Sequence, residues 1–283
     1  MTSIKKVGIL GSGIMGSGLA EVVARAGLDV VVRSRTQAGA DAVLAKVGSG
    51  LARQVAKERM TEEEREAILG RVSVTDHLGQ LADCDLVIES VVEDLEVKRA
   101  LFAELEQIVK PEGILATNTS TLPVVELAMM TQRPSQVCGI HFFNPAPAMS
   151  LVEIIRPLTA SDETINAAAS FVEACGKNAV HVEDRAGFIV NALLFPYLNN
   201  AVRMLQNGTA SMDDIDAAMI GGCNFPMGPF ALLDLVGLDT SVSILDALYA
   251  EFSDANYAAV PLLRRMVAAG HLGRKTKQGF RTY

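Results

Sequence analysis

Short apolar runs recur along the first two thirds of the chain and alternate with segments of helical periodicity. These runs are rich in Val, Ile and Leu, and several are apolar at every position, as expected for strands that are covered on both faces. They lie at Val7–Leu10, Val30–Val32, Asp85–Ile88, Ile114–Ala116, Val137–Ile140, Leu151–Ile155 and Ala179–Val182. The alternation predicts an α/β fold with a parallel, doubly wound sheet.

The pattern changes twice along the chain. Between Ala40 and Leu69 it becomes that of a helical pair, and Thr61 and Glu64 have the spacing of a capping box. After Asp184 the β-type runs stop, and helices rich in Leu, Ala, Val and Met follow. We therefore predict a sheet domain over residues 1–184 with a helical-pair insertion. A smaller, all-helical domain is predicted over residues 185–283, with its apolar faces buried against the first domain or a second subunit.

Composition narrows the classes of partner. The 283 residues carry 25 Lys and Arg against 33 Asp and Glu, a formal net charge of −8, which disfavours nucleic acid and anionic membrane surfaces. No segment approaches the roughly 18 apolar residues of a membrane span. The four cysteines are scattered and form no metal-ligating cluster, so we expect reduced thiols, no metal and a cytoplasmic protein. The uncharged stretch after Lys5 and Lys6 contains five glycines, which favours a strand and turn over a secretory leader.

A glycine-rich loop directly follows the first predicted strand. Its sequence is Gly11-Ser12-Gly13-Ile14-Met15-Gly16, and a helical pattern begins within it. In a strand–loop–helix context this spacing indicates a Rossmann-type dinucleotide site, because the glycines allow a tight turn and close approach of a pyrophosphate to the helix N-terminus. A ligand-free glycine turn is the alternative that the context disfavours.

The end of the second strand bears on cofactor choice. Sites for NAD usually place an acidic residue there, about 20 residues after the glycine loop, whereas this chain has Arg33-Ser34-Arg35. Guanidinium groups bind a 2′-phosphate that a carboxylate would repel, so we predict a preference for NADP(H) over NAD(H). The alternative is that one arginine stacks on the adenine while NAD binds.

Elimination among the four histidines leads to His141. His77, His181 and His271 have surface or strand explanations, but His141 ends an apolar strand at the carboxyl edge of the predicted sheet, where such folds bind ligands. Glu153 is the carboxylate within the apolar run at residues 151–155, so it needs a partner, and an imidazole would supply one. We predict that His141 is a general base oriented by Glu153. A surface role for Glu153 on an edge strand is the alternative.

Polar residues 117–121, Thr-Asn-Thr-Ser-Thr, follow another predicted strand at the same edge. They can hold a substrate, or serve as an ordinary helix cap.

At this point the sequence resembles the 3-hydroxyacyl-CoA dehydrogenases, closest to those that act on 3-hydroxybutyryl-CoA. The resemblance covers nearly the whole chain and rests on motifs in a specific order. These are GSGIMG at 11–16, ESVVEDLEVK at 89–98, NTSTL at 118–122, GIHFFNPAPAM at 139–149, LVEII at 151–155, GFIVN at 187–191, FPMGPF at 225–230 and GRKTKQGF at 273–280.

The resemblance implies an oxidoreductase that interconverts a (3S)-3-hydroxyacyl-CoA and a 3-ketoacyl-CoA with a nicotinamide cofactor. It places the catalytic His–Glu pair on His141 and Glu153, and the substrate-polarising residues on Ser120 and Asn191. It also implies a homodimer through the helical domain. Cofactor contacts are implied at Glu93, Lys98, Ser120, Asn144 and Lys275.

Two departures from the family pattern stand out. Ser34 replaces the usual acidic residue after the second strand, in agreement with the phosphate argument. The residues that touch coenzyme A in relatives have no clear match in the helical pair. Arg53, Lys57 or Arg59 are candidates to replace them. The alternative is that these cations are solvated surface residues.

Two other functions are alternatives. A related β-hydroxyacid dehydrogenase would use a lysine in the helical domain, where this chain has Asn191. A non-catalytic, dinucleotide-binding structural protein is the third reading, and the joint presence of His141, Glu153, Ser120 and Asn191 argues against it.

Overall fold

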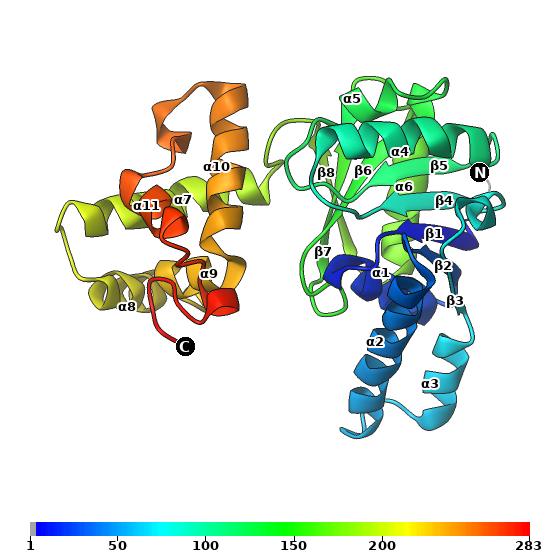
Figure 1. Cartoon of the computed structure of the whole chain (residues 1–283), viewed down its shortest axis with the longest axis horizontal. Helices are drawn as coiled ribbons and strands as arrows, with labels where there is room; N and C mark the ends of the chain where they lie inside the picture. Colours follow the sequence, from blue (N-terminus) through cyan, green and yellow to red (C-terminus); the bar gives the residue numbers. More distant parts are fainter. Residues whose placement is uncertain (1–3) are drawn as a thin grey trace. The chain divides into compact units, whose positions relative to one another are not determined.

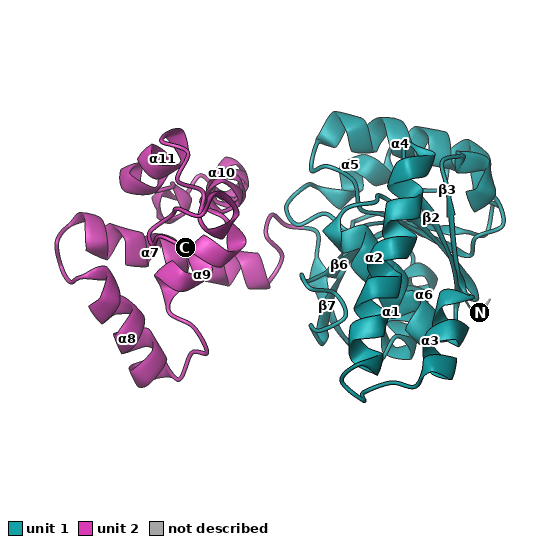
Figure 2. Ribbon diagram, turned by 60° about the horizontal axis from the view of Figure 1, so that its bottom comes forward, with its two compact units in different colours: residues 1–184 teal, residues 185–283 magenta. Residues whose placement is uncertain are grey.

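The computed structural model of the chain describes residues 4–283. The chain forms two compact units, with the boundary between residues 184 and 185 (Figure 2).

The first unit is built on an eight-stranded sheet with the order β3-β2-β1-β4-β5-β6-β7-β8 (Figure 1). Its strands are β1 (Lys6–Leu10), β2 (Asp29–Arg33), β3 (Val72–Thr75), β4 (Leu86–Glu89), β5 (Ile114–Thr117), β6 (Val137–Phe142), β7 (Leu151–Arg156) and β8 (Asn178–Glu183). Its helices are α1 (Ile14–Arg25), α2 (Gln37–Val55), α3 (Glu62–Leu69), α4 (Leu95–Ile108), α5 (Val124–Ala128) and α6 (Asp162–Ala174), with short 3₁₀ helices at Leu78–Leu81 and Pro134–Gln136.

Helices cover both faces of this sheet. Buried side chains of α1, α2 and α6 form one apolar cluster with the strands, while α4 and α5 lie together on the opposite face (Figure 1). Double coverage explains why the central strands are apolar throughout. The mostly parallel, doubly wound α/β fold is thus the one that the sequence predicts.

One strand pair departs from the parallel prediction. β6 and β7 are antiparallel, whereas β7 and β8 are parallel again. The reason is the connection: residues 143–150 join β6 to β7 without a helix, and a parallel crossover needs a longer segment. This reversal places β7 beside β6 with His141 opposite Glu153.

Two local expectations need adjustment. Edge strand β3 was not among the predicted runs, because its sequence Val-Ser-Val-Thr is short and half polar. The helical pair begins three residues earlier than the pattern indicates, since α2 starts at Gln37; its second helix, α3, starts at Glu62 and ends at Leu69, as predicted. The capping box of Thr61 and Glu64 at the start of α3 is confirmed.

The second unit is all helical. It contains α7 (Val190–Gln206), α8 (Met212–Cys223), α9 (Pro229–Val236), α10 (Leu238–Phe252) and α11 (Pro261–Ala268), with 3₁₀ helices at Ala255–Tyr257 and Arg274–Thr276. These helices share one apolar core. Asp234, buried in α9, accepts hydrogen bonds from the backbone N–H groups of Phe280 and Arg281 and so fixes the C-terminal segment. Among residues 4–283, no helix has the length and apolar content to cross a bilayer.

Candidate active site

Four neighbouring parallel strands, β1, β4, β5 and β6, end at one edge of the sheet. The chain leaves β1 toward β2 on one side and later returns to β4 on the other, so the topological switch point lies between β1 and β4. The glycine loop, the turn at residues 118–121 and His141 all lie at or near this edge because each belongs to one of these strand ends.

His141 and Glu153 form a buried pair. Nδ1 of His141 lies 2.7 Å from Oε2 of Glu153, and the two side chains are 5% and 1% exposed. A carboxylate accepts hydrogen bonds, so it holds the imidazole with its proton on Nδ1 and makes Nε2 the nitrogen that can take a proton. His77 and His181 are exposed and His271 is half-buried, so His141 is the one fully buried histidine within residues 4–283.

Ser120 stands on the other side of the imidazole. Its Oγ lies 3.1 Å from Nε2 of His141, and its side chain is half-buried. The neighbouring Asn118 accepts a hydrogen bond at Oδ1 from the backbone N–H of Phe142, 2.8 Å away. This bond ties the end of β5 to the end of β6, which fixes Ser120 relative to His141.

A single carboxylate holds the turn that carries Ser120. Oε1 of Glu93 accepts hydrogen bonds from the backbone N–H of Ser120 at 2.9 Å and of Thr121 at 3.3 Å, and from the hydroxyl of Thr119. Its other oxygen, Oε2, lies 3.1 Å from Nζ of Lys98. Glu93 thus connects the turn to a buried ammonium group.

Lys98 is 1% exposed and belongs to α4. Its Nζ donates to both carboxylate oxygens of Glu89, at 2.7 and 2.8 Å. Burial by itself would raise the pKa of Glu93, but the Lys98 charge and the hydrogen bonds from the turn outweigh it, so this pKa lies below its ordinary value of 4.5. Glu93 is therefore ionised at neutral pH.

The glycine loop forms a cradle for a bound group. A Cβ at Gly11 would lie 2.2 Å from the backbone oxygen of Ser90, and one at Gly16 would lie 1.9 Å from the oxygen of Gly11, so glycine is required at both positions. In contrast, a Cβ at Gly13, the N-cap of α1, would meet no described atom of residues 4–283 within 4 Å. The first turn of α1 carries no acidic residue, so its backbone N–H groups face this open space without a competing carboxylate.

The end of β2 presents two different arginines. Nε of Arg33 donates to the backbone oxygen of Asp76 at 3.3 Å, whereas Arg35 is exposed. Ser34 lies between them, buried, and its hydroxyl donates to Oγ of Ser12 in the glycine loop at 2.9 Å. The serine thus joins the second strand to the loop, and Arg35 extends outward beside it.

Three other predicted residues belong to other elements of the chain. Asn144 is exposed in the connection that follows β6. Asn191 is buried in the first turn of α7 in the second unit, and exposed Lys275 in the same unit pairs with Asp239. Their roles, and those of the other site residues, stay predictions.

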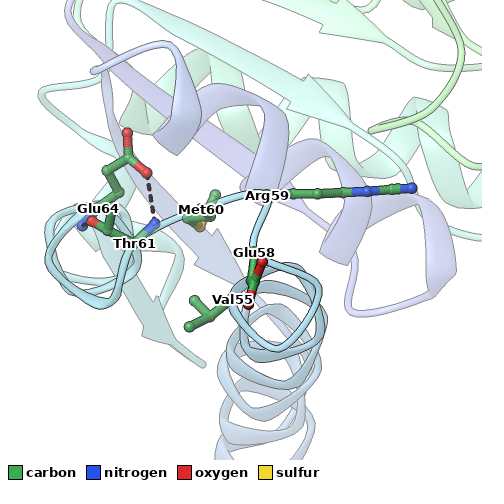
Figure 3. A pocket seen from close by; sticks show the side chains of 6 residues that line it. All are labelled: Val55, Glu58, Arg59, Met60, Thr61 and Glu64. Atoms are coloured by element: carbon green, nitrogen blue, oxygen red, sulfur yellow. Dashed lines mark hydrogen bonds between the residues drawn. The ribbon is translucent and has the colours of Figure 1, made fainter.

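The helical pair carries the predicted cations on its surface. Arg53 and Lys57 are exposed. A pocket of about 420 Å³ opens at the junction of α2 and α3; its lining includes Arg59, but neither Arg53 nor Lys57 (Figure 3). Figure 3 shows Thr61 and Glu64 joined by a hydrogen bond at the start of α3 and Arg59 extending away from them. The two glutamates among its lining residues, Glu58 and Glu64, make this pocket a poor phosphate site.

Two residues of the cluster were missed by sequence reasoning. Glu89 ends the apolar strand β4, and Asn118 was noticed only as part of a polar turn. The signal for Glu89 was present, since a carboxylate after three buried apolar residues needs a partner just as Glu153 does.

Comparison with known proteins gives a consistent result along the chain. The NAD binding domain of 3-hydroxyacyl-CoA dehydrogenase matches residues 6–185, and the C-terminal domain of the same family matches residues 187–283. The chain is 45% identical over 283 residues to a 3-hydroxybutyryl-CoA dehydrogenase of Mycobacterium tuberculosis, with 99% of each covered. It is 46% identical over 280 residues to one of Bradyrhizobium diazoefficiens, covering 99% of this chain and 96% of that one. Among solved structures, the (S)-3-hydroxybutyryl-CoA dehydrogenase PaaH1 of Ralstonia eutropha is similar with a TM-score of 0.97 and 41% identity, with 99% of each chain covered.

Proposed function

The chain belongs to the 3-hydroxyacyl-CoA dehydrogenase family, and on this basis we propose how its residues perform the reaction. It is an oxidoreductase, and its full-length relatives are named 3-hydroxybutyryl-CoA dehydrogenases. The substrate pair that we propose for this chain is 3-hydroxybutyryl-CoA and its oxidised form, acetoacetyl-CoA. The observation that carries the proposal is the buried His141–Glu153 pair with Ser120 on its open side.

His141 acts as the general base in the direction of oxidation. Its Nε2 takes the proton of the substrate 3-hydroxyl, and Glu153 stabilises the imidazolium that forms. In the opposite direction the same Nε2 returns the proton to the carbonyl oxygen. Ser120 lies 3.1 Å from Nε2 and donates a hydrogen bond to the same substrate oxygen. Asn191, implied by the family pattern, supports the negative charge that develops on a carbonyl oxygen.

The nicotinamide cofactor supplies the acceptor or donor of a hydride when it is bound. The residues fit such a group, because Gly13 leaves open space at the N-terminus of α1 while Gly11 and Gly16 close the turn tightly. The loop Gly11-Ser12-Gly13-Ile14-Met15-Gly16 would hold the pyrophosphate. Glu93 and Asn144 are partly or fully exposed at or near the carboxyl edge and are assigned to cofactor contacts, together with Lys275.

We infer that NADP(H) is preferred over NAD(H). Support comes from the end of β2, where Ser34 stands in place of a carboxylate and Arg35 extends into solvent. Nε of Arg33 is bonded to Asp76, so Arg35 is the stronger candidate for the 2′-phosphate. Measuring kcat/KM for NADPH and NADH tests this directly, and a preference for NADH of about tenfold, equivalent to about 1.4 kcal/mol, would overturn it.

For the coenzyme A portion we propose Arg53 and Lys57, both exposed on the helical pair, as partners of phosphate groups. Replacing each with alanine is expected to raise KM for acetoacetyl-CoA without lowering kcat. An unchanged KM in both variants would mean that these side chains do not bind coenzyme A.

We also propose a homodimer and a cytoplasmic location. The second unit exposes many large apolar side chains on helices α7 to α10 and on the loop between α8 and α9, more than a solitary helical unit needs. These are Leu193, Met204, Ile220, Phe225, Leu235 and Tyr249. Sedimentation equilibrium would give twice the chain mass, and a monomer at micromolar concentration would contradict the dimer. The cytoplasmic proposal rests on four free cysteines, and cell fractionation tests it.

The direct test of the function is acetoacetyl-CoA-dependent oxidation of NADPH and of NADH by the purified chain. Turnover with either cofactor is the expected result. Absence of turnover with both would reject the activity.

A further inference from the structure

A buried ion pair lies next to the turn that carries Ser120, and the reaction described above makes no use of it. Glu89 is fully buried at the end of β4, and Lys98 is 1% exposed on α4. Such pairs are costly to desolvate, and a hydrophobic pair of the same volume is often as stable. Their presence beneath a site therefore calls for an explanation beyond folding.

The donors and acceptors of this pair are all engaged. The Lys98 ammonium has three N–H donors, and its three acceptors are the two oxygens of Glu89 and Oε2 of Glu93. Glu89 also accepts from the hydroxyl of Thr117 at 2.8 Å and from the backbone N–H of Val91 at 2.6 Å. The ammonium is thus linked to the turn through Glu93.

Glu93 connects Lys98 to the turn that carries Ser120. One of its oxygens is held by Lys98, and the other accepts from the backbone N–H groups of Ser120 and Thr121 and from the Thr119 hydroxyl. Ser120 Oγ in turn lies 3.1 Å from Nε2 of His141. Without an anchored carboxylate, three donors of the turn would lose their common acceptor.

We propose that Glu89 is a positioning residue for the reaction: it fixes Lys98, which fixes Glu93, which sets the turn that aims Ser120 at His141. The inference rests on the proposed function, since it assigns a purpose to the placement of Ser120. Glu89 occupies two of the three N–H donors of Lys98, so only one donor is left for Glu93. Glu93 therefore keeps its other oxygen on the turn instead of binding Lys98 with both.

The kinetic test is a double-mutant cycle of Glu89→Gln and Ser120→Ala. Glu89→Gln keeps the shape and removes the charge, so Lys98 draws Glu93 away from the turn and kcat falls by roughly tenfold to a hundredfold. If Glu89 acts through Ser120, the same substitution has no further effect on kcat in the Ser120→Ala background. Equal factors in both backgrounds would overturn the proposal. Glu126→Gln is the matched control, because Glu126 forms a surface ion pair with Arg99 and does not contact the turn.

A second variant separates positioning from stability. The combined Glu89→Gln and Lys98→Met substitution leaves no unpaired buried charge in the pair, so the melting temperature recovers relative to Lys98→Met alone. Activity is expected to stay low, because Glu93 has then lost its anchor. Recovery of kcat together with stability would mean that the pair serves folding only.

The crystal structure of Glu89→Gln provides a readout that needs no activity. We expect Ser120 Oγ to lie beyond hydrogen-bonding distance of His141 Nε2, and an unmoved turn would overturn the proposal. Absence of turnover in the unsubstituted chain would reject the proposed function instead, while this structural comparison would still decide the role of Glu89.

Discussion

His141 and Glu153 lie directly opposite each other on the antiparallel strands β6 and β7, with Nδ1 of the imidazole 2.7 Å from Oε2 of the carboxylate. Because the pairing of the two strands fixes which residues face each other, the sheet itself sets the geometry of the pair. The carboxylate thereby determines which imidazole nitrogen carries a proton, and Nε2 is left to face Ser120.

Glu153→Gln tests this orientation. An amide at residue 153 can donate to Nδ1 and reverse the imidazole tautomer, so kcat is expected to fall by roughly tenfold to a hundredfold, with the fold retained. Steady-state kinetics with acetoacetyl-CoA would measure the loss. Glu183→Gln on the exposed side of β8 is the control and leaves kcat unchanged. Equal kcat in the Glu153 variant and the parent would mean that the pair is structural.

Arg35→Gln tests the cofactor assignment. Loss of a charged hydrogen bond to the 2′-phosphate is expected to lower kcat/KM for NADPH about tenfold or more, and to leave kcat/KM for NADH nearly unchanged. Arg71→Gln, at the start of edge strand β3, is the control, because its guanidinium donates to the backbone oxygen of Ala67 within the helical pair. A similar fall in kcat/KM with NADPH and with NADH would mean that Arg35 does not bind the 2′-phosphate.

Glu93→Gln tests the anchored carboxylate through the pH dependence of stability. The pKa of Glu93 in the folded state lies below its ordinary 4.5, so the ionised group stabilises the fold above that pH, and the stabilisation is lost as pH falls through the folded value. The parent is therefore more stable than the variant near neutral pH, and the difference shrinks below about pH 4.5. The side chain is 39% exposed, so we expect a difference of about 1 kcal/mol or less in urea unfolding.

The control for that series is Glu104→Gln, an exposed residue of α4, the helix that begins two residues after Glu93; it should show no pH-dependent difference from the parent. A Glu93 variant whose deficit stays constant, or grows, toward acid pH would contradict the assigned direction of the pKa.

The cysteines offer a test of packing. Burial raises the pKa of Cys84, Cys138 and Cys175 to about 12, whereas Cys223 is exposed at the end of α8. A disulfide reagent at mildly alkaline pH should therefore react quickly with one thiol in the folded chain, and with all four once the chain is unfolded. Loss of the fast phase in Cys223→Ser identifies the residue. A second fast thiol in that variant would contradict the burial.

Much of this arrangement could be predicted from local sequence patterns. The seven apolar runs all form strands, because a strand buried on both faces needs an uninterrupted apolar sequence. His141 and Glu153 were identified as partners since each is a polar group inside an apolar run. Edge strand β3 escaped because one of its faces meets solvent and its sequence is half polar.

Contacts between distant residues were harder to predict. The pairing of Glu89 with Lys98 depends on how α4 packs against the sheet. The sequence alone does not indicate which of several oppositely charged residues each of the two will contact. Ser34 is similar, since its hydroxyl bonds to Ser12, 22 residues earlier, only because β1 and β2 are neighbours. The antiparallel direction of β7 relative to β6 could have been predicted, because the connection at residues 143–150 is too short for a parallel crossover.

In the proposed mechanism, His141 moves the proton of the reaction. The most direct measurement is kcat for acetoacetyl-CoA reduction by His141→Gln, with circular dichroism to show that the fold is kept. Loss of a general acid–base group predicts a fall of roughly a hundredfold to ten-thousandfold. Turnover equal to that of the unsubstituted chain would contradict the claim.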